Sequence, residues 1–292
     1  MTYQLANLQH QFLEPLGDIP DAPTELWMQG TLPESRRPAV VSIVGSRRCT
    51  AYGEHLAYQI AYELAQRGII VVSGLAYGID TCAHRGCLDA GGTTIAILGT
   101  PIDRIHPRSN QTLADRILEQ GAILSEYAPS SRIERWHFLK RNRLVSGIAD
   151  AVIIVEASLR SGTFTTASQA VEQKKEVFAI PGDIGRIQSA GCNRLISLAT
   201  AHIYTGLEDF LTIVAPSLVT TSNGSASRRR AYPSPIAAAI IQQMRAGLTD
   251  GDQIIAALDL DVSNFNQAIT LLELRGFVVP VGCNAWALKD GV

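Results

Sequence analysis

Short apolar, β-branched runs alternate with helix-length amphipathic segments from residue 39 to about residue 212. The runs are continuous rather than alternating, which is typical of strands buried on both faces of a parallel sheet. The predicted strands are Val40–Val44, Ile69–Val72, Thr94–Leu98, Ala122–Ser125, Ala151–Val155, Glu176–Ala179 and His202–Tyr204. The predicted helices lie near 54–67, 80–89, 109–120, 140–149, 162–173 and 191–199. This alternation predicts an α/β fold with a mainly parallel sheet and helices on both faces.

Different patterns flank this region. Residues 1–38 form a lead-in with little periodicity, and we expect an irregular structure there. Residues 215–232 are rich in Ser, Thr, Gly and Arg, which is typical of a flexible linker, so we interpret the Arg228–Arg230 run as a solvated charge run. Residues 233–292 form a second predicted unit, which resembles a winged helix. Its predicted elements are helices near 235–245, 251–258 and 263–275, then strands Phe277–Val281 and Ala285–Leu288 around the turn Gly282–Asn284, with Gly276 ending the last helix.

The winged-helix-like unit has few cations where a DNA-binding helix would need them. The expected exposed positions of its last helix are Asn264, Asn266, Gln267, Thr270 and Glu273, and four aspartates lie nearby. Neutralising DNA phosphates requires Lys or Arg, and only Arg275 is close. We therefore interpret this unit as a protein-contact module.

Small and basic residues follow the predicted strands of the α/β region. Gly45-Ser46-Arg47 comes directly after one strand, and Ser73-Gly74 and Gly78-Ile79-Asp80 come after the next. The carboxyl ends of parallel strands meet at one edge of a sheet, where free N–H groups bind anions. This pattern predicts a phosphate site, with Arg47 as the gripping side chain. We interpret Asp80 as a helix N-cap; a metal or acid–base pair with His84 is disfavoured because no third ligand is in sight.

Arg132–Arg143 is the strongest local concentration of positive charge. The segment reads RIERWHFLKRNR and carries one acid, Glu134. Cations interleaved with rings are typical of single-strand binding, where the charges follow the backbone and the rings stack on bases. For Lys140 and Arg141 we favour phosphate contact, whereas Trp136 fits a core position equally well. Asn110 is a candidate donor to a base or to neighbouring backbone.

Composition restricts the possible functions. A net charge of −2 over 292 residues, with a pI near 6.3, argues against binding nucleic acid by bulk charge. Five scattered cysteines without a CxxC pair favour a reducing cytoplasm. The longest apolar runs are too short for a membrane span. No GxSxG, Walker or HExxH motif occurs, so we expect no catalytic residues, no metal and no cofactor.

Seven motifs in order identify a family. They are VSIVGSR, SGLAYGIDTCAH, HPRSN, FLKRNRLVSG, AVIIVEASLRSGTFTTA, VFAIPG and SAGCNRLI. Together they resemble the DNA-processing protein A family, also called Smf, from about Phe12 to Phe210 and more loosely beyond. The resemblance implies an extended Rossmann-type domain over 39–214 that binds single-stranded DNA. It further implies loading of a RecA-type recombinase, protection of incoming DNA in natural transformation, a homodimer, and no enzymatic activity.

The resemblance also assigns site residues. The motif arginine falls on Arg47, and the phosphate-contacting basic pair falls on Lys140 and Arg141. The complete predicted DNA-binding set is Gly45, Ser46, Arg47, Ser73, Gly74, Gly78, Asn110, Lys140, Arg141, Asn142 and Gly162. This chain departs from the family pattern at three places: Pro101 replaces a glycine, His106 replaces a tyrosine, and Leu139 replaces the proline that usually follows Phe138.

The main alternative is a nucleotide-processing enzyme. Phosphoribohydrolases of the same superfamily, the lysine-decarboxylase-like proteins, carry a Gly-Gly-x-Gly-Thr-x-x-Glu motif with a catalytic glutamate. Gly162-Thr163 matches the Gly-Thr, but Thr166 stands at the glutamate position. Losing that carboxylate removes the acid–base group, which disfavours catalysis. A small-nucleotide sensor would use the same strand ends and stays a third possibility.

Overall fold

The computed structural model describes residues 2–159, 161–219, 234–275, 277–282 and 284–288. The chain divides into two compact units, Met1–Thr220 and Thr221–Val292, and each is described by itself. Most of the predicted linker, including Arg228–Arg230, lies outside the described residues.

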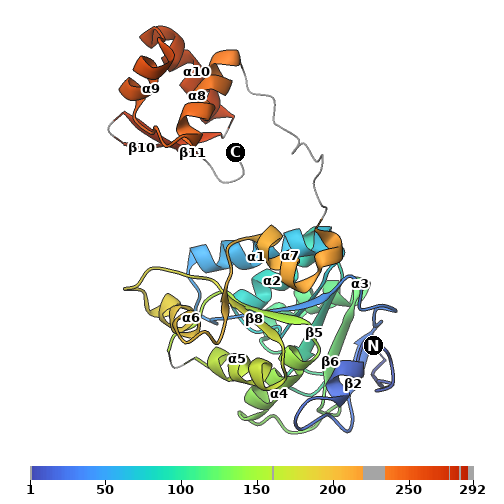
Figure 1. Cartoon of the computed structure of the whole chain (residues 1–292). Helices are drawn as coiled ribbons and strands as arrows, with labels where there is room; N and C mark the ends of the chain where they lie inside the picture. The colour runs from blue at the N-terminus through green and yellow to red at the C-terminus, as the bar shows by residue number, and fades with distance from the viewer. Residues whose placement is uncertain (1, 160, 220–233, 276, 283, 289–292) are drawn as a thin grey trace. The chain divides into compact units, whose positions relative to one another are not determined.

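The first unit is built on a nine-stranded sheet in the order β1-β2-β6-β5-β4-β3-β7-β8-β9 (Figure 1). The strands are β1 (Gln4–Leu5), β2 (Trp27–Gly30), β3 (Val40–Val44), β4 (Ile70–Ser73), β5 (Thr94–Leu98), β6 (Ala122–Ser125), β7 (Ala151–Ile154), β8 (Glu176–Ala179) and β9 (His202–Ile203). From β6 to β9 all neighbouring strands are parallel. All seven predicted strands are present, with small shifts at some ends, which confirms the mainly parallel sheet.

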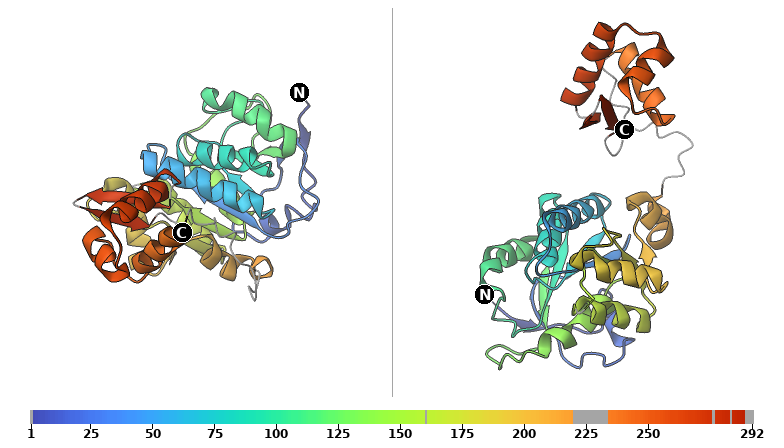
Figure 2. Two further views of the ribbon diagram at one scale, coloured as in Figure 1. Left: turned by 90° about the horizontal axis from the view of Figure 1, so that it is seen from above. Right: turned by 90° about the vertical axis from the view of Figure 1, so that its left-hand side faces the viewer.

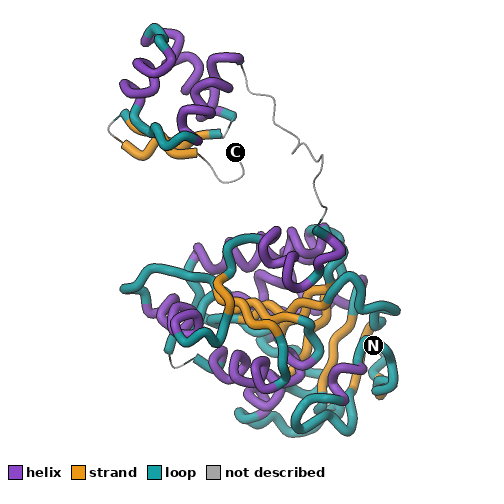
Figure 3. The backbone as a smooth tube through the Cα atoms, viewed as in Figure 1, coloured by secondary structure: helices purple, strands orange, loops and turns teal. Residues whose placement is uncertain are grey.

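Helices cover both faces of this sheet, as predicted (Figures 2 and 3). They are α1 (Ala51–Gln66), α2 (Ile79–Asp89), α3 (Gln111–Gln120), α4 (His137–Gly147), α5 (Thr163–Glu172), α6 (Ile187–Ser197) and α7 (Leu207–Val214), with 3₁₀ turns at Glu14–Gly17, Arg108–Asn110 and Pro216–Leu218. Neighbouring strand residues point to opposite faces. Val40 therefore packs into the core shared with α4–α6, and Val41 into the core shared with α1, α2 and α7.

The lead-in is more ordered than its sequence predicts, and our expectation of irregular structure is wrong for residues 27–30. They form β2, which pairs antiparallel with β6 from Trp27 opposite Ser125 to Gly30 opposite Ala122. Phe12, Leu13 and Leu16 are almost fully buried in the main core. A four-residue strand and a single 3₁₀ turn are too short to produce a periodic apolar pattern.

The second unit has the elements of a winged helix. They are α8 (Pro235–Arg245), α9 (Gly251–Leu258), α10 (Val262–Leu274) and the antiparallel pair β10 (Val278–Gly282) and β11 (Ala285–Leu288). Phe265, Ile269 and Leu272 of α10 are buried in its core, as their spacing predicts. Two of the acids are N-caps, since Asp250 accepts from the Gln253 N–H and Asp261 from the Ser263 N–H. Gly276 and Cys283 lie outside the described residues.

Within the described ranges, no helix combines the length and the apolar character that crossing a membrane requires.

Candidate nucleic-acid interface

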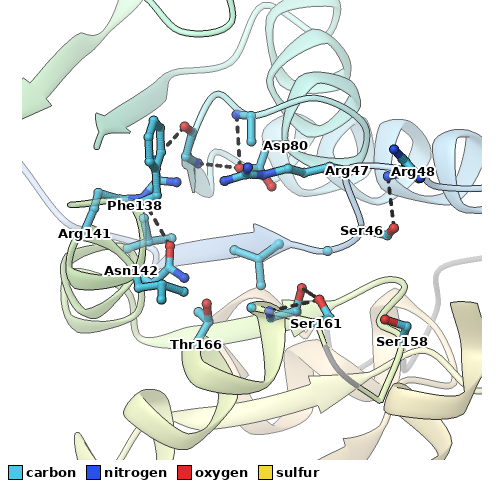
Figure 4. Close-up of a pocket in the computed structure, with 18 of the residues that line it drawn as sticks. Ser46, Arg47, Arg48, Asp80, Phe138, Arg141, Asn142, Ser158, Ser161 and Thr166 are labelled. Atoms are coloured by element: carbon cyan, nitrogen blue, oxygen red, sulfur yellow. Dashed lines mark hydrogen bonds between the residues drawn. The ribbon is translucent and has the colours of Figure 1, made fainter. Parts of the chain in front are cut away.

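A pocket of about 840 Å³ opens at the carboxyl ends of β3, β4 and β7 (Figure 4). After β3 the chain winds outward through β4, β5 and β6, and it then returns to the other side of β3 with β7. The strand order therefore reverses at β3, and such a switch point is where open α/β sheets bind ligands. The lining comes from the loops after these three strands, from the first residues of α2, α5 and α6, and from α4 together with Arg135 just before it.

The loop after β3 places Arg47 at the pocket, where its charge acts on Asp80 without forming an ion pair among the described residues. Gly45 fits closely, because a Cβ there would lie 2.7 Å from Ile79 Cγ1. The Ser46 N–H donates to the Glu156 carbonyl at 2.8 Å, which ties this loop to the end of β7. Arg47 is exposed, lies 5.5 Å from the centre of the Phe138 ring, and has no ion-pair partner among the described residues. Its guanidinium is therefore available to an anion.

The loop after β4 is fastened from behind by buried side chains. Ser73 Oγ donates to the Ile43 carbonyl at 2.7 Å, and Asn110 Nδ2 donates to the Leu75 carbonyl at 3.0 Å. Both side chains are buried, and neither lines the pocket. Of the two roles predicted for Asn110, the bond to neighbouring backbone is therefore the one observed. Gly78 also lies outside the lining; its φ of +75° and the close approach of the Ser46 carbonyl require glycine there.

Asp80 is a buried carboxylate and does not cap α2, so our interpretation of it as an N-cap is wrong. The N-cap position belongs to Gly78, and Asp80 Oδ2 instead accepts from the N–H groups of Gly74 and Ala76 at 3.2 and 3.3 Å. Burial raises the pKa of Asp80, although the nearby Arg141, the two amides and the charge of Arg47 act against this shift.

Arg141 lines the pocket but is only 4% exposed. Its Nη1 donates to the Gly74 carbonyl at 2.7 Å and also to the Ile97 carbonyl. A Cβ on Gly74 would lie 2.5 Å from the guanidinium, so the glycine makes room for this contact. Burial lowers the pKa of Arg141 to about 10. Arg141 therefore holds the β4 loop in position from below.

Lys140, predicted as the partner of Arg141 in phosphate contact, is not brought to the pocket. Its Nζ lies 3.6 Å from Asp21 Oδ2, and its side chain is not among the lining residues. Arg143, in the same predicted basic segment, is also not at the pocket. It is buried and forms ion pairs with Asp21 at 3.0 Å and Glu126 at 2.6 Å. The hydrogen bond from Arg143 is the main reason that the pKa of Asp21 is lowered.

The remaining predicted residues do reach the pocket. Asn142 lies on α4, and its Oδ1 accepts from Arg141 Nε at 3.3 Å. Gly162 precedes α5, where a Cβ would have Leu139 Cδ2, at 3.5 Å, as its one neighbour within 4 Å. Trp136 is 55% exposed and lies outside the lining, so its core interpretation is wrong.

Sequence reasoning missed several lining residues. Arg48 adds an exposed cation, and Ser161 accepts from the Thr163 N–H at 3.1 Å beside Gly162. Arg135, which belongs to the predicted basic segment Arg132–Arg143 but not to the predicted site residues, is exposed and also lines the pocket. Arg48 was detectable, since it directly follows the motif arginine. Ile187, at the start of α6, carries no local motif and reaches the pocket only through the fold.

His84 is a structural residue. It is fully buried, and its Nδ1 lies 2.8 Å from Thr94 Oγ1. No cluster of three or more metal-ligating side chains is found in the described part of the chain, so the disfavoured Asp80–His84 metal idea gains no support.

Acid should destabilise the protein through His84. Burial lowers the pKa of His84 to about 3, whereas an unfolded histidine titrates near 6.5. As the pH falls below about 6.5, the unfolded chain takes up a proton that the folded chain refuses, at a cost of up to about 1.4 kcal/mol per pH unit. Urea unfolding at pH 7 and pH 5 should show this loss, with a smaller loss in His84→Gln. An equal loss in the two proteins would contradict the assignment.

Known proteins match both units. The family model for DNA recombination-mediator protein A matches residues 5–215, and that for the DprA winged helix domain matches residues 225–282. The DNA processing protein DprA of Streptococcus pneumoniae is 40% identical over 191 residues, covering 65% of this chain and 67% of that protein. Protein Smf of Escherichia coli is 42% identical over 177 residues, covering 60% and 47%. For the putative DNA processing protein DprA of Mycobacterium tuberculosis, this chain matches half of the relative's length, 50%.

Solved structures agree with these matches. DNA processing protein A from Helicobacter pylori, in a structure described for its single-stranded DNA binding mode, has a TM-score of 0.68 and 30% identity, covering 74% of this chain and 97% of that chain. The Streptococcus pneumoniae protein has a TM-score of 0.66 and 35% identity, covering 73% and 75%. Because a family model matches well over half of its residues, this chain belongs to the DNA recombination-mediator protein A family, whose curated relatives are named DprA and Smf.

Proposed function

We propose that this protein binds single-stranded DNA in the pocket at the ends of β3, β4 and β7. The observation that carries the proposal is Arg47, an exposed guanidinium at the switch point of the sheet that forms no ion pair in the described part of the chain. Arg48 and Arg135 line the same pocket and are also exposed. In a chain whose net charge is −2, this local excess of cations favours a focal anionic ligand. The Helicobacter pylori relative described for single-stranded DNA binding supports the choice of ligand.

The proposed role is binding without catalysis. Thr166, at the position of the missing glutamate, is buried and lines the pocket. Asp80, the one carboxylate among the lining residues, accepts two loop amides and lies next to Arg141. These contacts favour a structural role for Asp80 over proton transfer.

The cellular role rests on family membership. We propose that the protein protects incoming DNA and loads a RecA-type recombinase onto it during natural transformation, acting in the cytoplasm as a homodimer. Matches to relatives named for DNA processing and for recombination mediation support this role. A recombinase loader must hold single-stranded DNA first, so the DNA site is the part to test before the others.

A titration with labelled oligonucleotides tests the proposal. We expect tighter binding to a single strand than to a duplex of the same length, because the cations lie inside a pocket and not along an open face. Affinity should fall as salt rises, with a log–log slope of about −2 if roughly three phosphates are neutralised. Equal affinity for duplex would contradict the proposal. A nucleotide-hydrolysis assay on the same preparation tests the enzyme alternative.

A further inference from the structure

A single carboxylate of the lead-in contacts two cations of α4. Asp21 Oδ2 lies 3.0 Å from Arg143 Nε and 3.6 Å from Lys140 Nζ. Neither cation lines the pocket, whereas their helix neighbours Arg141 and Asn142 do (Figure 4). The pocket therefore lies beside a positive charge, that of Lys140, which Asp21 neutralises.

Asp21 is held in place independently of Lys140. Its backbone φ of +56° belongs to a turn of the lead-in. Its carboxylate accepts a hydrogen bond from Arg143, whose side chain is only 5% exposed and also pairs with Glu126 at 2.6 Å. The buried arginine fixes the position of the carboxylate, so Lys140 only adds to an ion pair that is already formed.

The contact between Lys140 and Asp21 is the weaker of the two and is easily exchanged. Its N–O distance is 3.6 Å, and the Asp21 side chain is 64% exposed. Exposed ion pairs contribute little free energy, and the flexible stem of a lysine lets its ammonium group change partners. A phosphate at the rim of the pocket would compete with Asp21 for Lys140, while the anchored carboxylate would stay in place and repel that phosphate.

We propose that Asp21 limits the affinity of the pocket for single-stranded DNA by neutralising Lys140. This inference rests on the proposed function, since the competing anion is the phosphate of the strand. It makes a separate claim, because the proposed function requires only the arginines that line the pocket. A strand that is to be passed on must also be released, and neutralising one nearby cation favours release.

The test removes the carboxylate and measures how binding depends on salt. Asp21→Asn keeps the size of the side chain, and asparagine tolerates a positive φ. We expect this variant to bind a fluorescein-labelled oligothymidylate roughly threefold more tightly than the wild-type protein. The log–log slope against salt should steepen by about 0.7, the contribution of one further neutralised phosphate on a single strand. In Asp21→Asn/Lys140→Ala both changes should disappear.

A matched control releases a cation elsewhere in the same unit. Glu208 pairs with Arg67 at 2.6 Å, and neither residue lines the pocket. Arg67 follows the last residue of α1, a helix that runs from the carboxyl end of β3 to the amino end of β4, so its charge lies at the opposite edge of the sheet. Glu208→Gln should therefore keep the wild-type Kd and salt slope, since the released charge is screened over that distance.

Two results would overturn the inference while leaving phosphate binding by the arginines intact. One is an unchanged Kd and slope in Asp21→Asn, and the other is a gain in affinity that persists without Lys140. Urea unfolding checks the fold of Asp21→Asn, which retains the pair between Arg143 and Glu126. If that variant is unstable, Asp21→Gly repeats the test, because its φ suits glycine. If the wild-type protein bound no oligonucleotide, the proposed function would fail and the inference with it.

Discussion

Arg47→Glu is expected to weaken single-stranded DNA binding by about 100-fold or more. The exposed guanidinium of Arg47 is positioned for a charge-assisted hydrogen bond to phosphate, which contributes about 1.5–3 kcal/mol. Reversing the charge removes this bond and places a glutamate carboxylate where it repels the phosphate. Together these effects correspond to about 3 kcal/mol, or roughly 100-fold in Kd. Anisotropy titration at fixed salt measures the change directly.

Two variants serve as controls for Arg47. Arg194→Glu makes the same change in charge on the exposed side of α6, outside the pocket, and should weaken binding no more than roughly threefold. Lys140→Ala should have a similarly small effect, because Lys140 points to Asp21. If Lys140→Ala matched the effect of Arg47→Ala, the phosphates would have to follow the other side of α4, and the proposed pocket would be wrong.

Arg141→Ala is expected to lower the free energy of unfolding by about 3 kcal/mol or more. The substitution removes the Nη1 donor to the buried carbonyls of Gly74 and Ile97, and it leaves the buried Asp80 with the exposed Arg47 but without the closer, buried cation. Unsatisfied buried polar groups and unpaired buried charges are among the most destabilising changes in proteins. Urea unfolding followed by circular dichroism checks the size of the loss.

The pocket supplies a matched control for Arg141. Arg48 is also a lining arginine but is exposed, so Arg48→Ala should change stability by less than about 0.5 kcal/mol. Adding Asp80→Asn to Arg141→Ala should recover part of the lost stability, because the uncompensated carboxyl is gone. A marginal effect of Arg141→Ala would show that the buried contacts of its guanidinium contribute little, and would return Arg141 to a direct phosphate role.

The sequence predicts the parallel strands well because most of them are continuous apolar runs between residues that end strands. β2 lacks this signal: it has four residues, one of them a glycine, and it exists because β6 offers an edge. Local pattern cannot reveal a partner that is almost one hundred residues away. The winged-helix elements can be predicted because their signals are local: the spacing of the buried residues and the N-caps both lie within the helix that they define.

The rotation of α4 decides which predicted site residues are correct. Successive residues on a helix turn by about 100°, so neighbours in a basic run point in different directions. Arg141 points inward to the β4 loop, Lys140 points to Asp21, and Asn142 reaches the pocket. The motif RNR locates the right segment but cannot fix this rotation. Ile187 joins the site only because α6 packs beside the end of β7.

The fastened β4 loop has a consequence for the time course of binding. Before any ligand arrives, Asp80 accepts from two of its N–H groups, Asn110 and Arg141 each donate to one of its carbonyls, and Ser73 ties the end of β4 to the carbonyl of Ile43. A ligand therefore does not have to order this part of the wall, so association is governed by collision and electrostatic steering and not by a slow rearrangement. Substitutions at the pocket surface should therefore change mainly the dissociation rate of the DNA strand. Substitutions beneath the loop should change the fraction of protein molecules that are competent to bind.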